Sequence, residues 1–219
     1  MDRLIEGVQK FQKDVYPANR EMFRRLADGQ NPAAFFVACS DARVSLEWIT
    51  QSGPGEMFVS RNAGNIAPPF SPADSSSGTI EYAVGGLKVK HIVVCGHIDC
   101  GAMKGLLHPE KVAHMPNVKG WLRHCEAALR AFETCGIDRD SPEALPELTK
   151  LNVRLQLDHL RTHPAVFSAL RAGTLHVHGW VYGIGTGEVE AWDAGNFRWA
   201  SVSEAYKNQL AANQEAMYA

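Results

Sequence analysis

Three short apolar runs constrain the fold of this chain more than any other feature. They are AAFFVAC at 33–39, MFVSR at 57–61 and HIVVC at 91–95. Continuous apolar runs of this length are typical of strands buried on both faces, which occur mainly in parallel sheets. Between the second and third runs, segment 78–89 has apolar residues at helical spacing. This strand–helix–strand order predicts an α/β fold, with a mainly parallel central β-sheet flanked by helices.

The rest of the chain extends this pattern. Segments 117–132 and 147–172 have helical spacing, whereas 174–184 and 187–194 alternate polar and apolar residues around a Gly-Thr-Gly turn. The alternation predicts two further strands at the far side of the sheet. Segment 62–78 is rich in Gly, Pro and Ser and predicts a loop. A loop of that length inside a compact domain is usually functional or mobile.

The N-terminal segment 3–28 predicts a helix with a break near Pro17. Its apolar residues recur at helical spacing, so one side of this arm must be covered. The residues alone leave two alternatives open. The arm packs on the core of its own chain, or it packs on a partner subunit.

Composition excludes several classes of protein. The chain has 219 residues, enough for one domain with a sizeable core, and its net charge of −2 gives no electrostatic footprint for nucleic acid or an anionic membrane. No apolar run approaches the roughly 20 residues that span a bilayer. The first residues, MDRLIEGVQKFQKDVY, lack the features of a secretory signal, which predicts a cytoplasmic protein. An odd count of five cysteines argues against a disulfide framework.

Two cysteines and a histidine gather at predicted strand ends. His97 and Cys100 directly follow the run at 91–95, and Cys39 closes the run at 33–39. Because the carboxyl ends of parallel strands meet at one edge of a sheet, these side chains should converge. Two thiolates and one imidazole suit Zn²⁺, with a fourth position open in a catalytic site. His-x-x-Cys alone is a weak motif, and the third ligand from another strand strengthens it.

Asp41 and Arg43 come immediately after Cys39. Asp41 could fill the fourth zinc position or accept a hydrogen bond from water there. Arg43 could pair with it, because a guanidinium meets a carboxylate in bidentate geometry. The alternative is a turn residue followed by an unrelated surface charge.

Six motifs follow one another along the chain. They are CSDAR at 39–43, RNAGN at 61–65, EYAV at 81–84, VVCGHIDCGAM at 93–103, HMPNVKGWL at 114–122 and LHVHGWVYGI at 175–184. In order and spacing, over roughly residues 1–195, these motifs resemble the β-class carbonic anhydrases. The last two resemble the bacterial branch, including members associated with cyanate metabolism. The resemblance implies one Zn²⁺ per chain and the reversible hydration of CO₂ to bicarbonate and a proton through zinc-bound hydroxide.

The same resemblance assigns residues to roles. It implies Cys39, His97 and Cys100 as zinc ligands and Asp41 with Arg43 as the catalytic pair. It also implies four substrate-binding residues: Gln30 as a hydrogen-bond donor, Phe58 and Tyr82 as walls of an apolar CO₂ pocket, and Gly101 through its backbone amide.

In the family such pockets form at a dimer interface, with the Gln and aromatic residues coming partly from the neighbour. The expected assembly is therefore a homodimer or a higher oligomer of dimers, with the N-terminal arm on a partner subunit. We expect one domain over 1–219, made of an arm at 1–30, a zinc-binding α/β core at 31–195 and a tail at 196–219.

Two departures from the family pattern matter. Ala42 replaces the usual Ser between Asp and Arg, which we interpret as a tolerated loss of one hydroxyl. Phe36 stands where an allosteric subgroup has the Trp of a non-catalytic bicarbonate site, although Arg61 and Tyr182 resemble the other members of that site. Without the indole N–H, we expect no such bicarbonate site.

Two rival functions remain at this point. Relatives of the same fold hydrolyse CS₂ or COS, and they differ mainly in access to the pocket. A non-enzymatic zinc or redox protein, with Asp41 as a permanent fourth ligand, is the rival from another class.

Overall fold

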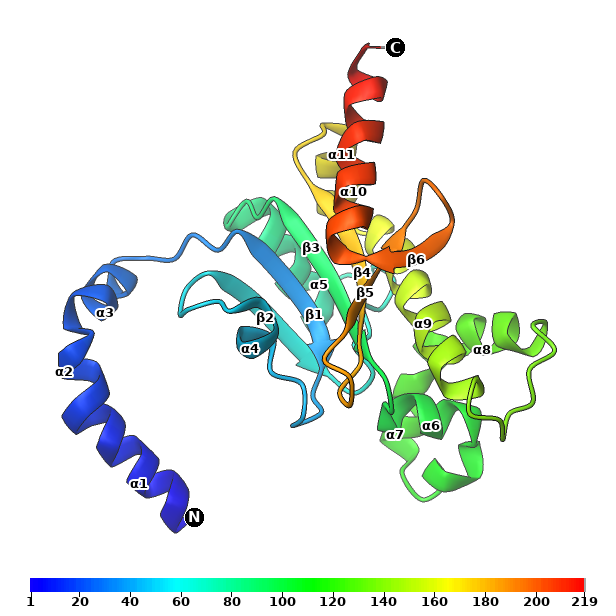
Figure 1. Ribbon diagram of the computed structural model, residues 1–219, viewed down its shortest axis with the longest axis horizontal. Helices are drawn as coiled ribbons and strands as arrows, with labels where there is room; N and C mark the ends of the chain where they lie inside the picture. The colour runs from blue at the N-terminus through cyan, green and yellow to red at the C-terminus, as the bar shows by residue number, and fades with distance from the viewer. Residues whose placement is uncertain (219) are drawn as a thin grey trace.

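The computed structural model describes the backbone of residues 1–218 and the side chains of residues 1–211. A six-stranded sheet in the order β2-β1-β3-β4-β5-β6 lies at its centre (Figure 1). The first four strands in this order are parallel, and β5 and β6 are antiparallel additions at one edge. The predicted α/β fold with a mainly parallel sheet is confirmed. The strands are β1 (Ala34–Cys39), β2 (Met57–Asn62), β3 (His91–His97), β4 (His176–Tyr182), β5 (Val189–Asp193) and β6 (Arg198–Ser201).

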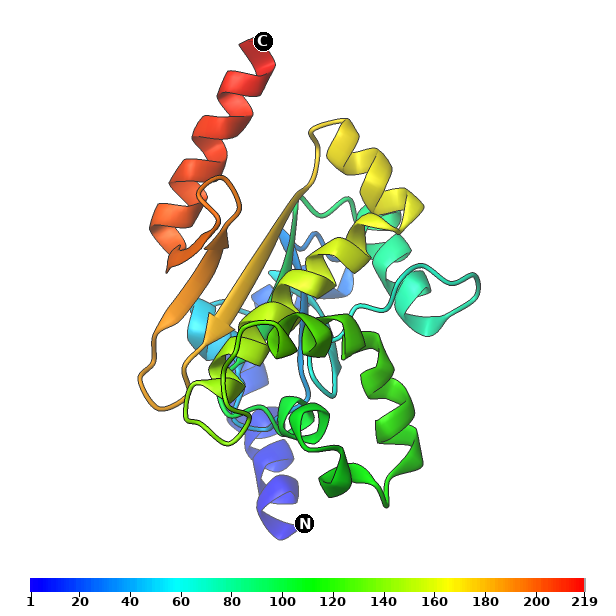
Figure 2. The same cartoon turned by 90° about the vertical axis from the view of Figure 1, so that its right-hand side faces the viewer.

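Helices lie on both faces of the sheet (Figure 2). One face carries α5 (Ser75–Glu81), which continues as a π-helical turn over Tyr82–Gly86, together with α9 (Ala144–Arg161) and α10 (Pro164–Arg171). The other face carries α4 (Leu46–Thr50) and α11 (Val202–Tyr218).

The apolar run of β1 is explained by this double cover. Phe35 and Val37 pack into the core beneath α9, where Val153 and Leu157 meet them. The alternate residues of the strand, such as Phe36, point to the opposite face and join the core around α4. Because successive side chains point to opposite faces, a strand covered on both faces must be apolar throughout.

A cluster of short helices sits beyond the carboxyl ends of β1 and β3. It has its own core, into which Cys39 and Cys100 are packed. The predicted helix at 117–132 is divided here into α7, a 3₁₀ turn and α8, and the predicted helix at 147–172 is divided between α9 and α10. The cluster contains α6 (Gly101–Leu107), a 3₁₀ turn at Pro109–Val112, α7 (Pro116–Trp121), a 3₁₀ turn at Leu122–Cys125 and α8 (Glu126–Glu133).

The predicted loop at 62–78 is confirmed over 63–74. Helix α5 begins earlier than expected, because the Asp74 carboxylate accepts hydrogen bonds from the amides of Ser76 and Ser77 at 2.9 and 3.2 Å. Helix α9 holds the main chain of this loop with buried polar side chains. Asn152 donates to the Gly64 carbonyl at 3.1 Å, and Gln156 accepts from the Ala67 amide at 3.0 Å.

Two more contacts extend this row of side chains along the loop. A ring nitrogen of His163 lies 2.9 Å from the Pro68 carbonyl oxygen, and the Thr162 hydroxyl accepts from the Phe70 amide at 2.8 Å. The loop is therefore bound through its backbone, which satisfies polar groups that would otherwise be buried without partners.

The N-terminal arm stands apart from the body of the chain and is joined to it by residues 28–33 (Figure 1). It is helical with an interruption near Pro17, as predicted, and none of its side chains is buried. Leu4 is 67% exposed and Val8 is 57% exposed. Packing on its own core, one of the two alternatives, is therefore not what this chain does. The arm consists of α1 (Asp2–Lys10), a π-helical turn at Phe11–Val15, α2 (Tyr16–Ala18) and α3 (Arg20–Ala27).

The segment after residue 195 is more than a tail. Strand β6 pairs with β5 inside the sheet, and α11 packs back on the sheet face from Val202 onwards. The sheet thus extends past the expected end of the α/β core. Among the residues that the structure describes, no helix combines the length and apolar character needed to cross a membrane.

Candidate metal centre

Cys39, His97 and Cys100 come together at the carboxyl edge of the sheet. Cys39 is the last residue of β1, His97 is the last residue of β3, and Cys100 lies directly before α6. All three are buried, and their ligand atoms lie within 4.8 Å of one another. Within residues 1–211, this is the group of three or more such side chains that could hold a metal ion. The predicted convergence of the two strand ends is confirmed.

The geometry of these three side chains fits zinc. The two sulfur atoms are 3.9 Å apart, far beyond the roughly 2.05 Å of a disulfide. Two thiolates about 2.3 Å from one tetrahedral Zn²⁺ would lie about 3.8 Å apart. His97 has its Nδ1 3.0 Å from the Ile98 carbonyl oxygen, while its Nε2 is buried without a hydrogen-bond partner among the described residues. An Nδ1–H held by a carbonyl leaves Nε2 as a lone pair for a metal.

The two thiols also share one negative charge. The neighbouring Cys100 thiol lowers the pKa of Cys39 to about 4. The pKa of Cys100 is raised in turn, because it donates to Cys39 and is buried. A divalent cation would stabilise both as thiolates. By contrast, burial is the main cause that raises the pKa of Cys95 and of Cys125 to about 12, so these are inert core thiols.

Arg43 holds the Asp41 carboxylate beside these ligands. Its Nε donates to Oδ1 at 2.9 Å, its Nη2 donates to Oδ2 at 2.8 Å, and its backbone amide donates to Oδ1 at 2.9 Å. These bonds hold the pKa of Asp41 well below its usual range, so the carboxylate is ionised. Its Oδ2 lies 3.8 Å from Nε2 of His97. An ionised acceptor therefore faces the ligand atoms while both of its oxygens are engaged by Arg43.

Asp99 also contacts Arg43, and the sequence reasoning missed it. Arg43 donates from Nη1 to the Asp99 carboxylate at 2.9 Å and from Nη2 to the Asp99 carbonyl oxygen at 3.1 Å. Lys104, on α6, forms an ion pair with the same carboxylate. The position of Asp99 between His97 and Cys100 was the available signal, because a charged residue between two ligands is rarely far from the site.

The expected substrate residues are divided between two places. We call the carboxyl edge of the sheet, where Cys39, His97 and Cys100 lie, the metal edge. Gly101 is the first residue of α6 and adjoins Cys100 there. Phe58 pairs in register with Phe35, four positions before Cys39 along the strands, or about 13 Å.

Tyr82 packs against Phe58, with ring centroids 5.9 Å apart. Gln30 precedes β1 at the same amino end. Phe58 and Tyr82 are thus in contact with each other, Gln30 lies in the segment before β1, and all three are on the side of the sheet away from the chain's own metal ligands.

Arg61 binds backbone carbonyl groups near the metal edge. It donates to the carbonyl oxygens of Cys39, Asp41 and Val44 at 3.0, 2.9 and 2.6 Å. Phe36 packs on Trp180, with ring centroids 5.7 Å apart. The absence of a second bicarbonate site, expected from Phe36, stays a prediction.

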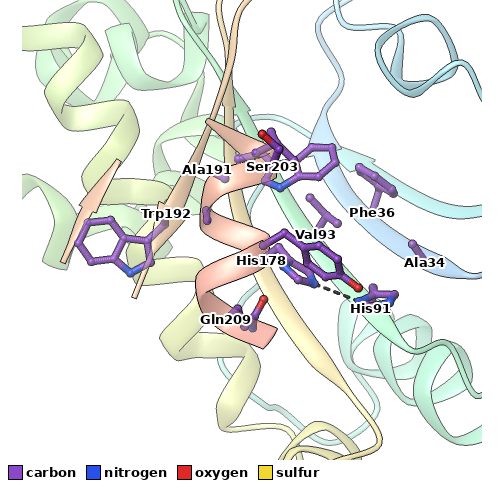
Figure 3. Close-up of a pocket in the computed structure, with 13 residues that line it drawn as sticks. Ala34, Phe36, His91, Val93, His178, Ala191, Trp192, Ser203 and Gln209 are labelled. Carbon is purple, nitrogen blue, oxygen red and sulfur yellow. Dashed lines mark hydrogen bonds between the residues drawn. The ribbon is translucent and has the colours of Figure 1, made fainter. Parts of the chain in front are cut away.

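A cavity of about 630 Å³ lies elsewhere, between the sheet and α11 (Figure 3). Its walls include Phe36, Trp180 and Trp192, and at one end His91 and His178 approach each other with ring nitrogens 3.1 Å apart. These two histidines belong to the starting halves of β3 and β4. The cavity is therefore separate from the metal edge.

Three comparisons with known proteins agree with one another. The family profile described as "Carbonic anhydrase" matches residues 34–189. The carbonic anhydrase of Pseudomonas aeruginosa is 46% identical over 205 residues, which cover 93% of each protein. The solved structure of the β-carbonic anhydrase CcaA superposes with a TM-score of 0.88 at 40% identity, covering 92% of this chain and 91% of that one. A chain from the crystal structures of two tetrameric β-carbonic anhydrases of Sordaria macrospora superposes with a TM-score of 0.74 at 32% identity. The match covers 87% of this chain and 95% of that one.

Proposed function

The chain belongs to the β class of the carbonic anhydrases, and from this membership we propose how its own residues carry out the reaction. The reaction is the reversible, zinc-dependent hydration of CO₂ to bicarbonate and a proton. What remains to be assigned is the role of each side chain.

Cys39, His97 and Cys100 are the zinc ligands in this proposal. Bound there, the ion supplies a Lewis acid that makes water a nucleophile near neutral pH. The two thiolates bring two negative charges where imidazoles would bring none, which tempers that Lewis acidity. The carbonyl of Ile98 keeps the His97 ring in the tautomer that offers Nε2.

Asp41 orients the attacking water. As an ionised carboxylate it can only accept, so it takes a hydrogen bond from the nucleophile and turns the nucleophile's lone pair toward CO₂. The engagement of both Asp41 oxygens by Arg43 is the observation that carries this proposal. A carboxylate held in that way leaves the fourth position to water, which a catalytic zinc site needs and a structural one lacks.

The apolar pocket for CO₂ is completed by a second copy of the chain. Phe58 and Tyr82 form an apolar wall, and Gln30 with the Gly101 amide binds the oxygens of the anionic product. Because Gln30, Phe58 and Tyr82 lie at the amino end of the strands, we propose that they serve the metal edge of a partner in a homodimer, or in an oligomer built from dimers. The exposed apolar residues of the N-terminal arm support this, since they need a partner surface.

Mixing two inactive variants tests this arrangement. Cys39→Ser should remove the metal edge, and Tyr82→Ala combined with Gln30→Ala should remove the pocket wall. A heterodimer of the two has one site with every defect and one site with none, so activity should return on mixing and refolding. If the mixture stays inactive although heterodimers are detected by mass, each site is built within one chain.

The reaction itself is tested by stopped-flow CO₂ hydration from about pH 6.5 to about pH 9 on protein with zinc quantified per chain. One zinc per chain and a rate that rises through a single ionisation would support the assignment. One zinc without activity even at high pH would contradict it, and COS turnover would then separate a sulfur hydrolase from a structural zinc site.

We also propose a cytoplasmic location and one domain over residues 1–219. All five cysteines are free, which suits a reducing compartment. Strand β6 completes the same sheet and α11 covers it, while the arm at 1–30 serves the proposed assembly, which supports treating all of them as parts of that domain.

A further inference from the structure

We propose that Asp99 is a positioning residue for the Asp41–Arg43 pair: together with Lys104 it fixes Arg43 from the side away from Asp41, and so keeps Asp41 turned toward the attacking water instead of the metal. This inference rests on the role of Asp41 given above. It adds a third and a fourth member to the pair and assigns them a task in the reaction.

The contacts of the Arg43 guanidinium carry the argument. A guanidinium has five N–H donors in a fixed planar fork. One side of the Arg43 fork, Nε with Nη2, meets the two carboxylate oxygens of Asp41. The remaining outward donors, on Nη1 and Nη2, meet the carboxylate and the main-chain carbonyl of Asp99. A planar group held on two sides cannot pivot about the Asp41 contact without breaking bonds to Asp99.

Asp99 is itself held in place. Its backbone has φ of +66°, in the left-handed region that few residues other than Gly, Asn and Asp adopt readily. This conformation accompanies an arrangement in which both its carbonyl and its side chain face Arg43. Lys104 engages the other carboxylate oxygen from the first turns of α6. The segment between His97 and Cys100 therefore binds Arg43 as well as supplying the ligands at either end.

Exposure limits the size of the effect. The side chains of Arg43, Asp99 and Lys104 are 47%, 49% and 46% exposed. Ion pairs exposed to that degree contribute little to folding. The contribution of Asp99 is therefore orientational, and its loss should change the reaction while leaving stability almost untouched.

The substitution Asp99→Asn removes the charge and keeps a residue that tolerates the left-handed backbone. Its matched control is Asp158→Asn, which removes a carboxylate that is likewise paired with an arginine, Arg161 at 2.7 Å, on a different surface. In the zinc enzyme, Asp99→Asn should keep its metal and lower kcat/KM by roughly two- to fivefold, the range open to an exposed ion pair. Asp158→Asn should match the wild type.

Cobalt substitution gives a readout besides activity, because visible absorption of Co²⁺ reports its ligand set. Arg43→Gln, which releases Asp41 altogether, supplies the reference spectrum. At one fixed neutral pH, the spectrum of Asp99→Asn should move toward that of Arg43→Gln. The shift should vanish when Asp41→Ala is added. In the Arg43→Gln background, Asp99→Asn should cause no further loss of kcat/KM, because the two residues act through one contact.

Two results would overturn the inference. One is wild-type kcat/KM and a wild-type cobalt spectrum in Asp99→Asn. Another is a loss of activity with an unchanged spectrum, which would place the effect outside Asp41. In both cases an active, zinc-loaded wild type leaves the proposed function standing. An inactive wild type would remove that function and this inference with it.

Discussion

Strand β3 begins and ends in a histidine, and the two ends behave differently. His91, at the start, pairs with His178 at 3.1 Å and stacks on His176 with ring centroids 5.5 Å apart, beside an open cavity (Figure 3). His97, at the end, is fully buried, with one nitrogen held by a carbonyl and the other without a partner among the described residues, next to two thiols. The comparison shows that residue type alone does not make a histidine a metal ligand. A ring nitrogen without a hydrogen-bond partner must also lie next to other atoms that can bind the metal.

The two ends of the sheet differ in a second way. The metal ligands at the carboxyl end are enclosed by their own chain, because Cys39 and Cys100 pack in one core with the helices α6 to α8. The amino end carries Gln30, Tyr82 and the arm, all of which are exposed in the single chain. Zinc binding can therefore be tested on the ligands of one chain, whereas the proposed CO₂ pocket calls for a second copy.

The largest effect is expected when the two terminal histidines of β3 are replaced by alanine, one at a time. His97→Ala should lose zinc and nearly all activity, since it removes one of three ligands. His91→Ala should retain both, because His91 pairs with another histidine and lies outside the group formed by Cys39, His97 and Cys100. Zinc per chain and stopped-flow CO₂ hydration measure the two outcomes. Retention of zinc by His97→Ala, or its loss from His91→Ala, would break the comparison.

A smaller effect is expected from Asp41→Asn. The variant should keep zinc, because the three ligands are intact, and lose about 10- to 100-fold in kcat/KM, as groups next to a metal site usually do. An amide presents a donor where the carboxylate accepted, and Arg43 loses its charged partner. Zinc content and initial rates are measured side by side. Normal turnover would exclude Asp41 as the orienting acceptor.

Gly96, the residue before His97 in β3, offers a test of stability. A Cβ added at Gly96 would lie 2.7 Å from Cγ2 of Val153 and 3.3 Å from Cγ2 of Thr149, both on α9. Gly96→Ala should therefore lower the free energy of unfolding by about 1–3 kcal/mol, the usual cost of overpacking. Urea denaturation measures it.

A second substitution tests whether the clash between the added Cβ and Val153 causes this loss of stability. Combined with Val153→Ala, which removes the closest atoms, Gly96→Ala should cost less than it does alone. Simple additivity of the two substitutions would mean that the crowding between β3 and α9 does not decide the choice of glycine.

The smallest effect concerns His178, near the amino end of β4, and the way the stability of the fold depends on pH. Burial, with His91 and His176 nearby, lowers the pKa of His178 to about 4. The unfolded chain, with an ordinary histidine pKa of about 6.5, binds more protons than the folded chain between these two values. His178 therefore weakens the fold as pH falls from about 6.5 to about 4, and His178→Gln should flatten this part of the Tm profile. The exposed His114→Gln serves as the control and should leave the slope unchanged.

Much of the fold could be predicted from local pattern. The apolar runs located β1, β2 and β3 to within about two residues, because burial on both faces leaves little choice of side chain. Strand β6 was missed, since four residues with one buried side chain carry no periodicity. The break between α9 and α10 was missed because Pro164 is tolerated as the first residue of a new helix, so the helical spacing continues across it.

The ligands were predictable for a different reason. Cys39 and His97 end parallel neighbouring strands, and topology alone brings such ends together. Asp99 was not predictable, since its contact with Arg43 depends on a left-handed backbone and joins residues 56 apart in the chain. The same holds for Asn152 and Gln156, whose partners lie 88 and 89 residues away.

Those two side chains have a consequence for how the loop at 63–74 can change over time. Helix α9 and Thr162, the residue that follows it, bind carbonyls and amides of the loop, and every amino acid other than proline supplies both groups. Exchanges to residues other than proline at the exposed positions 69–73 leave those atoms where they are. A residue inserted or deleted between Gly64 and Phe70 moves bound atoms out of register with the helix. The loop can therefore vary in sequence at its exposed positions, while its length between Gly64 and Phe70 is fixed.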